Sequence, residues 1–237
     1  MFEAFVTNAA LYPIRGVEVG EYLTFPATTE QVQALLSRIG IESPEKGELF
    51  ITNFESDVLG LYDYLNEYES IDELNHLAHE LEEVRDGGGI ETFEAALVLG
   101  KHTGSVKDLI NLTHNLDLYT FLADISDEEG LGHYYADELH AIEIPDNIVN
   151  YFDYEAYGRD IAINEGGCFA PGGYVAAARS SFVELYHGPE DIPDEHRIFA
   201  YPDRKEERAS ILNTIKQFQE TPPAPKKEKA GFSHEER

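Results

Sequence analysis

Two histidines at helical spacing form the pattern closest to a catalytic or metal site. His76 and His79 lie three positions apart and Glu80 follows them. On a helix this spacing would place two imidazoles side by side, where they could bind a metal ion. The run does not complete a His-Glu-x-x-His motif, and no spaced third ligand supports it. We therefore expect both histidines to be solvent-exposed on a charged helix face.

The other reactive groups are equally unspecific. Cys168 could act as a nucleophile if His and Asn gathered round it, but we expect a small, partly buried residue. Paired carboxylates could hydrolyse glycosides. With 46 acidic residues in the chain, however, the presence of such a pair does not indicate a hydrolase. The glycine runs at 87–89 and 166–167 lack P-loop and dinucleotide-binding spacing, so we interpret both as turns. The sequence thus predicts no active site, cofactor or metal.

Charge is the exceptional property of this chain. The 237 residues contain 46 Asp and Glu against 17 Lys and Arg, a formal net charge of −29. Direct binding to nucleic acid is disfavoured because phosphate contacts need a basic surface. A single cysteine excludes an intrachain disulfide and fits a reducing compartment. With no basic, apolar leader and no membrane-length apolar run, we expect a soluble, cytoplasmic protein.

The negative charge is concentrated in two windows without lysine or arginine. Residues 47–84 contain eleven acidic residues and residues 108–158 contain twelve. Leaving whole helices without basic partners costs stability, so the pattern favours a surface directed at a basic partner. A generally acidic proteome would instead spread the charge evenly. Residues 201–237 hold 7 acidic and 8 basic residues, which argues against that alternative.

The elements that carry these charges begin with a small ββαβ module. Residues 2–7, 18–25 and 48–54 are typical of strands. Thr28 and Gln31 form a capping-box pattern before a helix that ends near Gly40. A second capping box, Ser70 with Glu73, opens an amphipathic helix that stops at glycines 87–89. Two more short helices follow, the second capped by Ser105.

The region after residue 115 mixes strands and helices. We expect a strand from Leu116, and a helix opened by a capping box of Ser126 and Glu129. A further helix should start near Pro145 and stop at Gly158. Residues 159–164 and 173–178 are typical of two strands joined by a glycine-rich turn. Beyond these, residues 203–219 could form a charged helix before a flexible Pro- and Lys-rich tail at 221–229.

These elements predict an α+β fold with a highly acidic surface. We expect an N-terminal α+β domain at 1–60 and a central helical domain at 61–115. A third α+β domain follows at 116–187. Residues 188–237 form a C-terminal extension.

Three blocks of sequence resemble the ArdA antirestriction proteins. They are Val6-Thr-Asn8 with Gly16 and Val19-Gly-Glu-Tyr-Leu-Thr-Phe-Pro26, then Ser70-Ile-Asp-Glu-Leu-Asn-His-Leu-Ala78, then Tyr151-Phe-Asp-Tyr-Glu-Ala-Tyr-Gly-Arg-Asp160. The resemblance runs from about residue 2 to residue 187, in the same order and spacing. It leaves the last fifty residues uncovered.

The resemblance implies a protein that mimics bent B-form DNA. Such a protein is elongated, with three small domains in a row, dimerises through the third, and needs neither catalysis nor cofactor. It occupies the DNA-binding groove of type I restriction-modification enzymes and so protects incoming mobile DNA. Tyr134 and Tyr135 are the candidate dimer contact. We define the acidic set as the carboxylates expected on the mimic surface: Glu67, Glu69, Asp72, Glu73, Glu80, Glu82, Glu83, Asp124, Asp127, Glu128, Glu129, Asp137, Glu138, Glu143, Asp146, Asp153, Glu155 and Asp160.

Two alternatives remain open at this level. The chain could be an acidic adaptor that binds a basic protein unrelated to DNA, or a carboxylate hydrolase. A hydrolase should lose function when a single Asp or Glu is replaced. A mimic should lose it only gradually, because its binding energy is spread over many screened charges.

Overall fold

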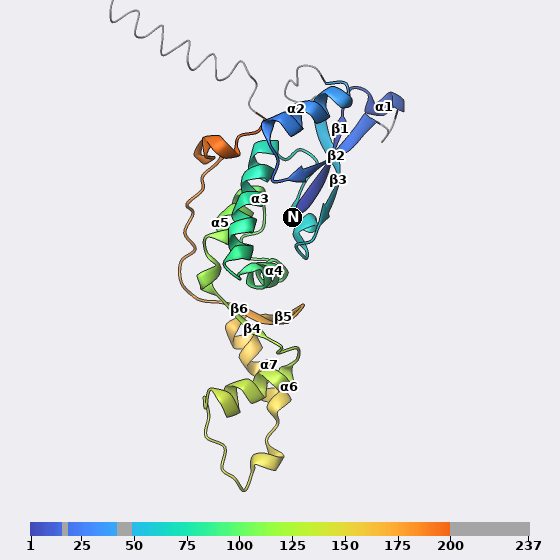
Figure 1. Cartoon of the computed structure of the whole chain (residues 1–237). Coiled ribbons are helices and arrows are strands. Elements are labelled where there is room, and N and C mark those ends of the chain that lie inside the picture. The colour runs from blue at the N-terminus through green and yellow to red at the C-terminus, as the bar shows by residue number, and fades with distance from the viewer. Residues whose placement is uncertain (16–18, 42–48, 200–237) are drawn as a thin grey trace, which may run out of the picture. The chain divides into compact units, whose positions relative to one another are not determined.

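The computed structural model describes residues 1–15, 19–41 and 49–199, which form a mixed α+β fold with two three-stranded sheets and seven helices (Figure 1). The strands are β1 (Phe2–Asn8), β2 (Gly20–Phe25), β3 (Leu49–Ser56), β4 (Tyr119–Ala123), β5 (Cys168–Ala170) and β6 (Gly173–Ala177). The helices are α1 (Tyr12–Arg15), α2 (Thr29–Arg38), α3 (Ile71–Asp86), α4 (Ile90–Leu99), α5 (Val106–Thr113), α6 (Glu128–His133) and α7 (Tyr154–Glu165).

The first sheet has the strand order β2-β1-β3, and both pairings are antiparallel. Alternate residues of β1, namely Phe2, Ala4 and Val6, are buried, as the period of a strand requires. The three predicted N-terminal strands are therefore confirmed within the described residues. The capping box of Thr28 and Gln31 is also confirmed, because both of its reciprocal hydrogen bonds are present at the start of α2.

The three predicted central helices are α3, α4 and α5. Ser70 caps α3 by accepting a hydrogen bond from the Glu73 amide, and Ser105 caps α5 in the same way. Gly87 ends α3, as predicted. The Glu73 carboxylate accepts from the Tyr186 hydroxyl at 2.9 Å, so this side chain serves a distant segment rather than a capping box.

The second sheet has the order β4-β6-β5, again antiparallel. The predicted strand at 173–178 is β6, while the predicted strand at Leu116 begins three residues later, after a 3₁₀ turn at Leu116–Leu118. Pro171 and Gly172 make the turn between β5 and β6. Gly166, expected in that turn, instead caps the C-terminus of α7 in the left-handed conformation.

The predicted strand at 159–164 is wrong, because these residues are the second half of α7. Gly158, predicted to stop a helix, lies inside it at a close helix crossing. A Cβ atom at Gly158 would lie 1.9 Å from the Glu128 carbonyl oxygen, and one at Gly132 would lie 2.0 Å from the Tyr154 carbonyl oxygen. Both glycines allow the backbones of α6 and α7 to come into contact. Gly158 is therefore required for packing and does not end the helix.

The predicted helix starts around α6 and α7 are also corrected. Asp127, not Ser126, caps α6 by accepting from the Gly130 amide at 2.8 Å. A π-helical turn, Tyr134–Glu138, continues α6 through both tyrosines. The predicted helix from Pro145 is limited to a 3₁₀ turn at Val149–Tyr151, and Asp153 caps the following α7.

The main hydrophobic core joins the first sheet, the helices α2 to α5 and β6. It also includes three buried residues from beyond the sheets, Tyr186, Ile192 and Ile198. A second, smaller cluster of Leu131, Tyr174 and Ala176 lies between α6 and the second sheet. The domain limits at residues 60, 115 and 187 stay a prediction. The predicted helix at 203–219 and the tail at 221–229 lie outside the described residues.

Candidate functional site

Most carboxylates of the acidic set are exposed. Thirteen of the eighteen lie on the surface: Glu67, Glu82, Glu83, Asp124, Asp127, Glu129, Asp137, Glu138, Glu143, Asp146, Asp153, Glu155 and Asp160. Ten of these belong to α6, α7 and the segments next to them. In this region Arg159 forms an ion pair with Glu155, with a distance of 3.9 Å between the charged groups. Such a long, exposed contact neutralises little charge.

Some exposed carboxylates are held in place by local bonds. Asp137 lies 2.7 Å from His133 Nδ1 and accepts from the Tyr154 hydroxyl at 3.2 Å. The hydrogen bond with His133 lowers the pKa of Asp137, so this carboxyl stays charged. The rings of His133 and Tyr154 stack 3.7 Å apart, which fixes the geometry. The side chains of Asp127 and Asp153 cap their helices.

The remaining five carboxylates are half-buried. They are Glu69, Asp72, Glu73, Glu80 and Glu128. Two of them, Asp72 and Glu73, bind the segment that follows the second sheet, and Glu80 lies between two histidines. Asp72 Oδ1 accepts from the amides of Ile198 at 2.8 Å and Phe199 at 2.6 Å. Burial raises the pKa of Glu73, whose carboxylate accepts from Tyr186. The side chains of Asp72, Glu73 and Glu80 therefore make contacts within the protein that stabilise its fold.

His76 is buried, which corrects the expectation that both histidines are exposed. Its Nδ1 lies 2.9 Å from Nδ1 of His196, and the ring of His79 stacks on His196 at 4.0 Å. Glu80 lies between His76 Nδ1, at 3.5 Å, and His114 Nε2, at 3.3 Å. Burial lowers the pKa of His76 to about 4 and raises that of Glu80.

The histidine cluster is held together by hydrogen bonding and ring stacking. The two Nδ1 atoms face each other at hydrogen-bond distance, so one ring donates and the other accepts. In residues 1–15, 19–41 and 49–199, no group of three or more His, Cys, Asp or Glu side chains is arranged to hold a metal ion. Cys168 is half-buried, as predicted, and burial raises the pKa of its thiol, which disfavours the nucleophilic thiolate.

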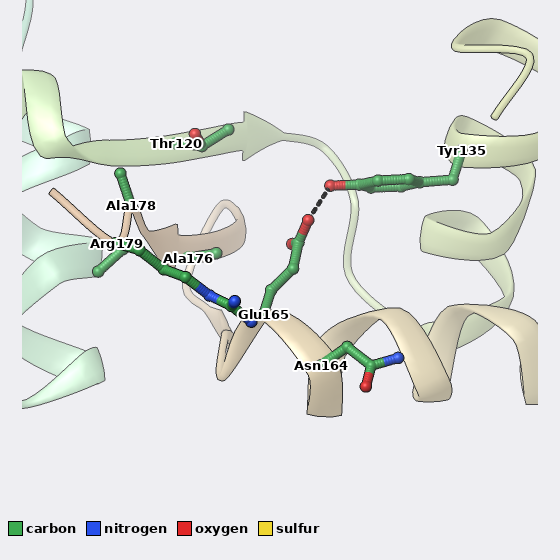
Figure 2. Close-up of a pocket in the computed structure, with 8 residues that line it drawn as sticks. Thr120, Tyr135, Asn164, Glu165, Ala176, Ala178 and Arg179 are labelled. Carbon is green, nitrogen blue, oxygen red and sulfur yellow. Dashed lines mark hydrogen bonds between the residues drawn. The ribbon is translucent and has the colours of Figure 1, made fainter.

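The two candidate dimer tyrosines are half-buried and lie edge to face, with ring centroids 5.7 Å apart. Tyr135 already has an internal partner, because its hydroxyl donates to Glu165, which also accepts from Tyr174 at 3.0 Å. Figure 2 shows Tyr135 pointing at Glu165, to which it is hydrogen-bonded. Both side chains line a pocket of about 210 Å³. The dimer contact stays a prediction.

Five exposed carboxylates beyond residue 176 are absent from the acidic set predicted from sequence. These are Glu184, Glu190, Asp191, Asp194 and Glu195. They lie on the segment whose buried residues are Tyr186, Ile192 and Ile198. The six-residue spacing of those apolar positions was the available signal, but it matches neither a helix nor a strand.

No helix within the described part of the chain is long and apolar enough to cross a membrane. Comparison with known proteins then gives a family. The family described as "Antirestriction protein (ArdA)" matches residues 4–176, from within β1 to within β6. No curated protein sequence matches the chain.

Proposed function

The chain belongs to the ArdA family of antirestriction proteins, and from this premise we propose that it inhibits type I restriction-modification enzymes by occupying their DNA-binding groove in place of B-form DNA. In doing so it would protect incoming mobile DNA in a new host. The proposal assigns it no catalysis, because an inhibitor of this kind acts by binding alone.

The exposed carboxylates around α6 and α7 are the observation that carries this proposal. Duplex DNA presents about one negative charge per 1.7 Å of its axis. A helix rises about 1.5 Å per residue, so carboxylates every few residues give a comparable but sparser line of charge. The thirteen exposed carboxylates of the acidic set supply such charges. A basic DNA-binding groove would attract them by long-range electrostatic steering.

The family resemblance also supports an elongated arrangement of three domains, at 1–60, 61–115 and 116–187, with a homodimer formed through the third. Tyr134 is the better of the two candidate contacts, because the Tyr135 hydroxyl is engaged by Glu165 within the same chain. Sedimentation of the Tyr134→Ala variant tests this arrangement. If the variant stays dimeric, the dimer contact does not depend on Tyr134.

A competition experiment tests the proposed target. A purified type I methyltransferase is bound to labelled duplex DNA, and the protein is titrated in at several salt concentrations. The proposal predicts displacement of the DNA that weakens steeply as salt rises, because screening acts on exposed charges. Binding to the enzyme without displacement of DNA would favour the acidic-adaptor alternative, and no binding at low salt would contradict the proposal.

A charge-matched pair of variants locates the surface. One neutralises four exposed members of the acidic set, Glu138→Gln, Glu143→Gln, Asp146→Asn and Asp160→Asn. The control neutralises four exposed carboxylates outside the set, Asp63→Asn, Asp86→Asn, Glu91→Gln and Asp117→Asn. We expect the first to weaken inhibition about ten- to hundredfold, at up to about 1 kcal/mol per contact, and the control to weaken it much less. Equal losses would mean that net charge alone matters.

A further inference from the structure

Residues 182–199, which we name the strap, lie along α3 and α5 after the second sheet. Figure 1 shows this segment in tan and orange beside the two helices. Its regular structure is limited to two 3₁₀ turns, Pro189–Asp191 and Asp194–His196. The strap follows residue 176, where the family match ends, whereas α3 and α5 lie inside the match.

Two buried asparagines, Asn111 of α5 and Asn115 just after its end, bind the main chain of the strap. Asn111 Oδ1 accepts from the amides of Leu185 at 2.7 Å and Tyr186 at 2.9 Å, and its Nδ2 donates to the Tyr186 carbonyl at 2.8 Å. Asn115, one helical turn later, binds both main-chain groups of Val183. Its Oδ1 accepts from the amide at 3.0 Å and its Nδ2 donates to the carbonyl at 2.9 Å.

The same kind of contact continues along α3. Asn75 Nδ2 donates to the His196 carbonyl at 2.9 Å. Asp72 accepts from the amides of Ile198 and Phe199. Side chains of α3 and α5 therefore bind strap amides and carbonyls at both of its ends.

The strap side chains divide into anchors and outward groups. Tyr186, Ile192 and Ile198 are buried, and the Tyr186 hydroxyl donates to Glu73. Val183 and Leu185 are 53% and 59% exposed, although their amides are bound. Main-chain hydrogen bonds combined with pockets for a few side chains are also used by proteins that bind extended peptides in trans.

From these contacts we propose that the face of α3 and α5 is a groove for an extended peptide, and that the strap occupies it as an exchangeable intramolecular ligand. The groove fits a segment that presents free amides at positions 183, 185 and 186 and an aromatic hydroxyl at 186. The proposal is independent of the target of the acidic surface, so either can fail without the other.

Cleavage of the folded chain tests exchange. Residues 178–181 are exposed, so a site-specific protease sequence inserted after Ser180 can be cut after folding. A labelled synthetic peptide of residues 181–199 is then added to the cut protein, and exchange is followed by fluorescence anisotropy. We expect the peptide to bind and to displace the cleaved strap. Unfolding of the cut chain, or no exchange at any peptide concentration, would show an integral part of the fold and overturn the proposal.

Two modified peptides separate main-chain recognition from packing. N-methylation of the Val183 amide removes the donor to Asn115, and we expect it to weaken binding about ten- to hundredfold because a buried acceptor loses its partner. A peptide with Val183→Ala and Leu185→Ala keeps every amide and should bind within about threefold of the parent. Equal binding of the methylated peptide would contradict the proposal.

A matched pair of protein variants completes the test. Asn111→Ala removes three hydrogen bonds to the strap and should weaken peptide binding to the cut chain at least about tenfold. Asn164→Ala removes an exposed asparagine of α7 and should leave binding unchanged. If Asn111→Ala does not fold, binding of the methylated peptide to the cut chain without this substitution still tests the proposal.

Discussion

Gly132 and Gly158 set how closely α6 and α7 approach each other. Each faces the backbone of the other helix at a distance that leaves no room for a methyl group. A peptide backbone cannot move aside as a flexible side chain can. These two residues therefore fix the geometry on which the exposed carboxylates of both helices depend.

Replacement of Gly158 by alanine tests that role. We expect Gly158→Ala to lower the free energy of unfolding by about 1–3 kcal/mol or more, because the new Cβ would overlap the Glu128 carbonyl. Asn164→Ala, an exposed change on the same helix, is the control and should leave it within about 0.5 kcal/mol. Urea denaturation measures both. A stabilised Gly158→Ala, as helix propensity alone predicts, would contradict the close crossing.

His76 makes stability depend on pH. Its pKa is about 4 in the folded protein because burial disfavours the charged ring, whereas an unfolded histidine titrates near 6.5. The folded pKa is the lower one, so this stabilisation is complete above about pH 6.5 and is lost as pH falls toward 4.

Between pH 7 and pH 4.5 we expect the unmodified chain to lose about 1–2 kcal/mol more unfolding free energy than His76→Gln does. Glu80, whose pKa burial raises, acts in the opposite direction but is common to both chains. His140→Asn, a change at an exposed histidine, is the control and should behave like the unmodified chain. Parallel pH curves for His76→Gln and the unmodified chain would contradict the assignment.

At the scale of elements, the start of α6 depends on Asp127. The Asp127 side chain accepts from the Gly130 amide, while Ser126 is exposed and precedes the cap. We expect Asp127→Ala to destabilise the protein by about 0.5–2 kcal/mol and Ser126→Ala to have little effect. Thermal unfolding of the two variants distinguishes them, and a larger effect of Ser126→Ala would restore the capping box predicted from sequence.

The elements that could be predicted are those whose local signals agree with their packing. Thr28, Ser70 and Ser105 cap helices as their spacing indicates, and the predicted strand at 2–7 is β1, with buried residues alternating around Ala4. The second half of α7 was misassigned because Gly158 signals a stop, although only the crossing with α6 explains it. The strap was missed because side chains far away in sequence, not a ladder or a helix, satisfy its amides.

The exposure of the individual carboxylates could be predicted only in part. Residue type and the absence of lysine and arginine indicated which segments carry charge, and thirteen of eighteen carboxylates are exposed. Asp72, Glu73 and Glu80 lie in the same window without lysine or arginine, but their carboxylates contact other residues of the chain instead of solvent alone. Their partners, among them Ile198, Tyr186 and His76, are known only once the chain is folded.

At the scale of the whole molecule, a net charge of −29 opposes compactness. Raising NaCl from 0.1 M to 1 M shortens the screening length from about 10 Å to about 3 Å. We expect the thermal unfolding midpoint to rise with salt, while binding to a basic target weakens over the same range. The variant neutralised at Glu138, Glu143, Asp146 and Asp160 should show a smaller rise. A midpoint that falls with salt would contradict this view.

Anchoring by Asn111 and Asn115 has an evolutionary consequence. Because these asparagines bind main-chain atoms, we expect mutations of the outward side chains of Val183 and Leu185 to leave the attachment intact. We therefore expect the size and shape of outward residues such as Val183 and Leu185 to change without a compensating change in α5, whereas Glu184 is paired with Lys107 of α5 at 2.8 Å. We expect this outward surface to diverge faster than the helices that bind the strap.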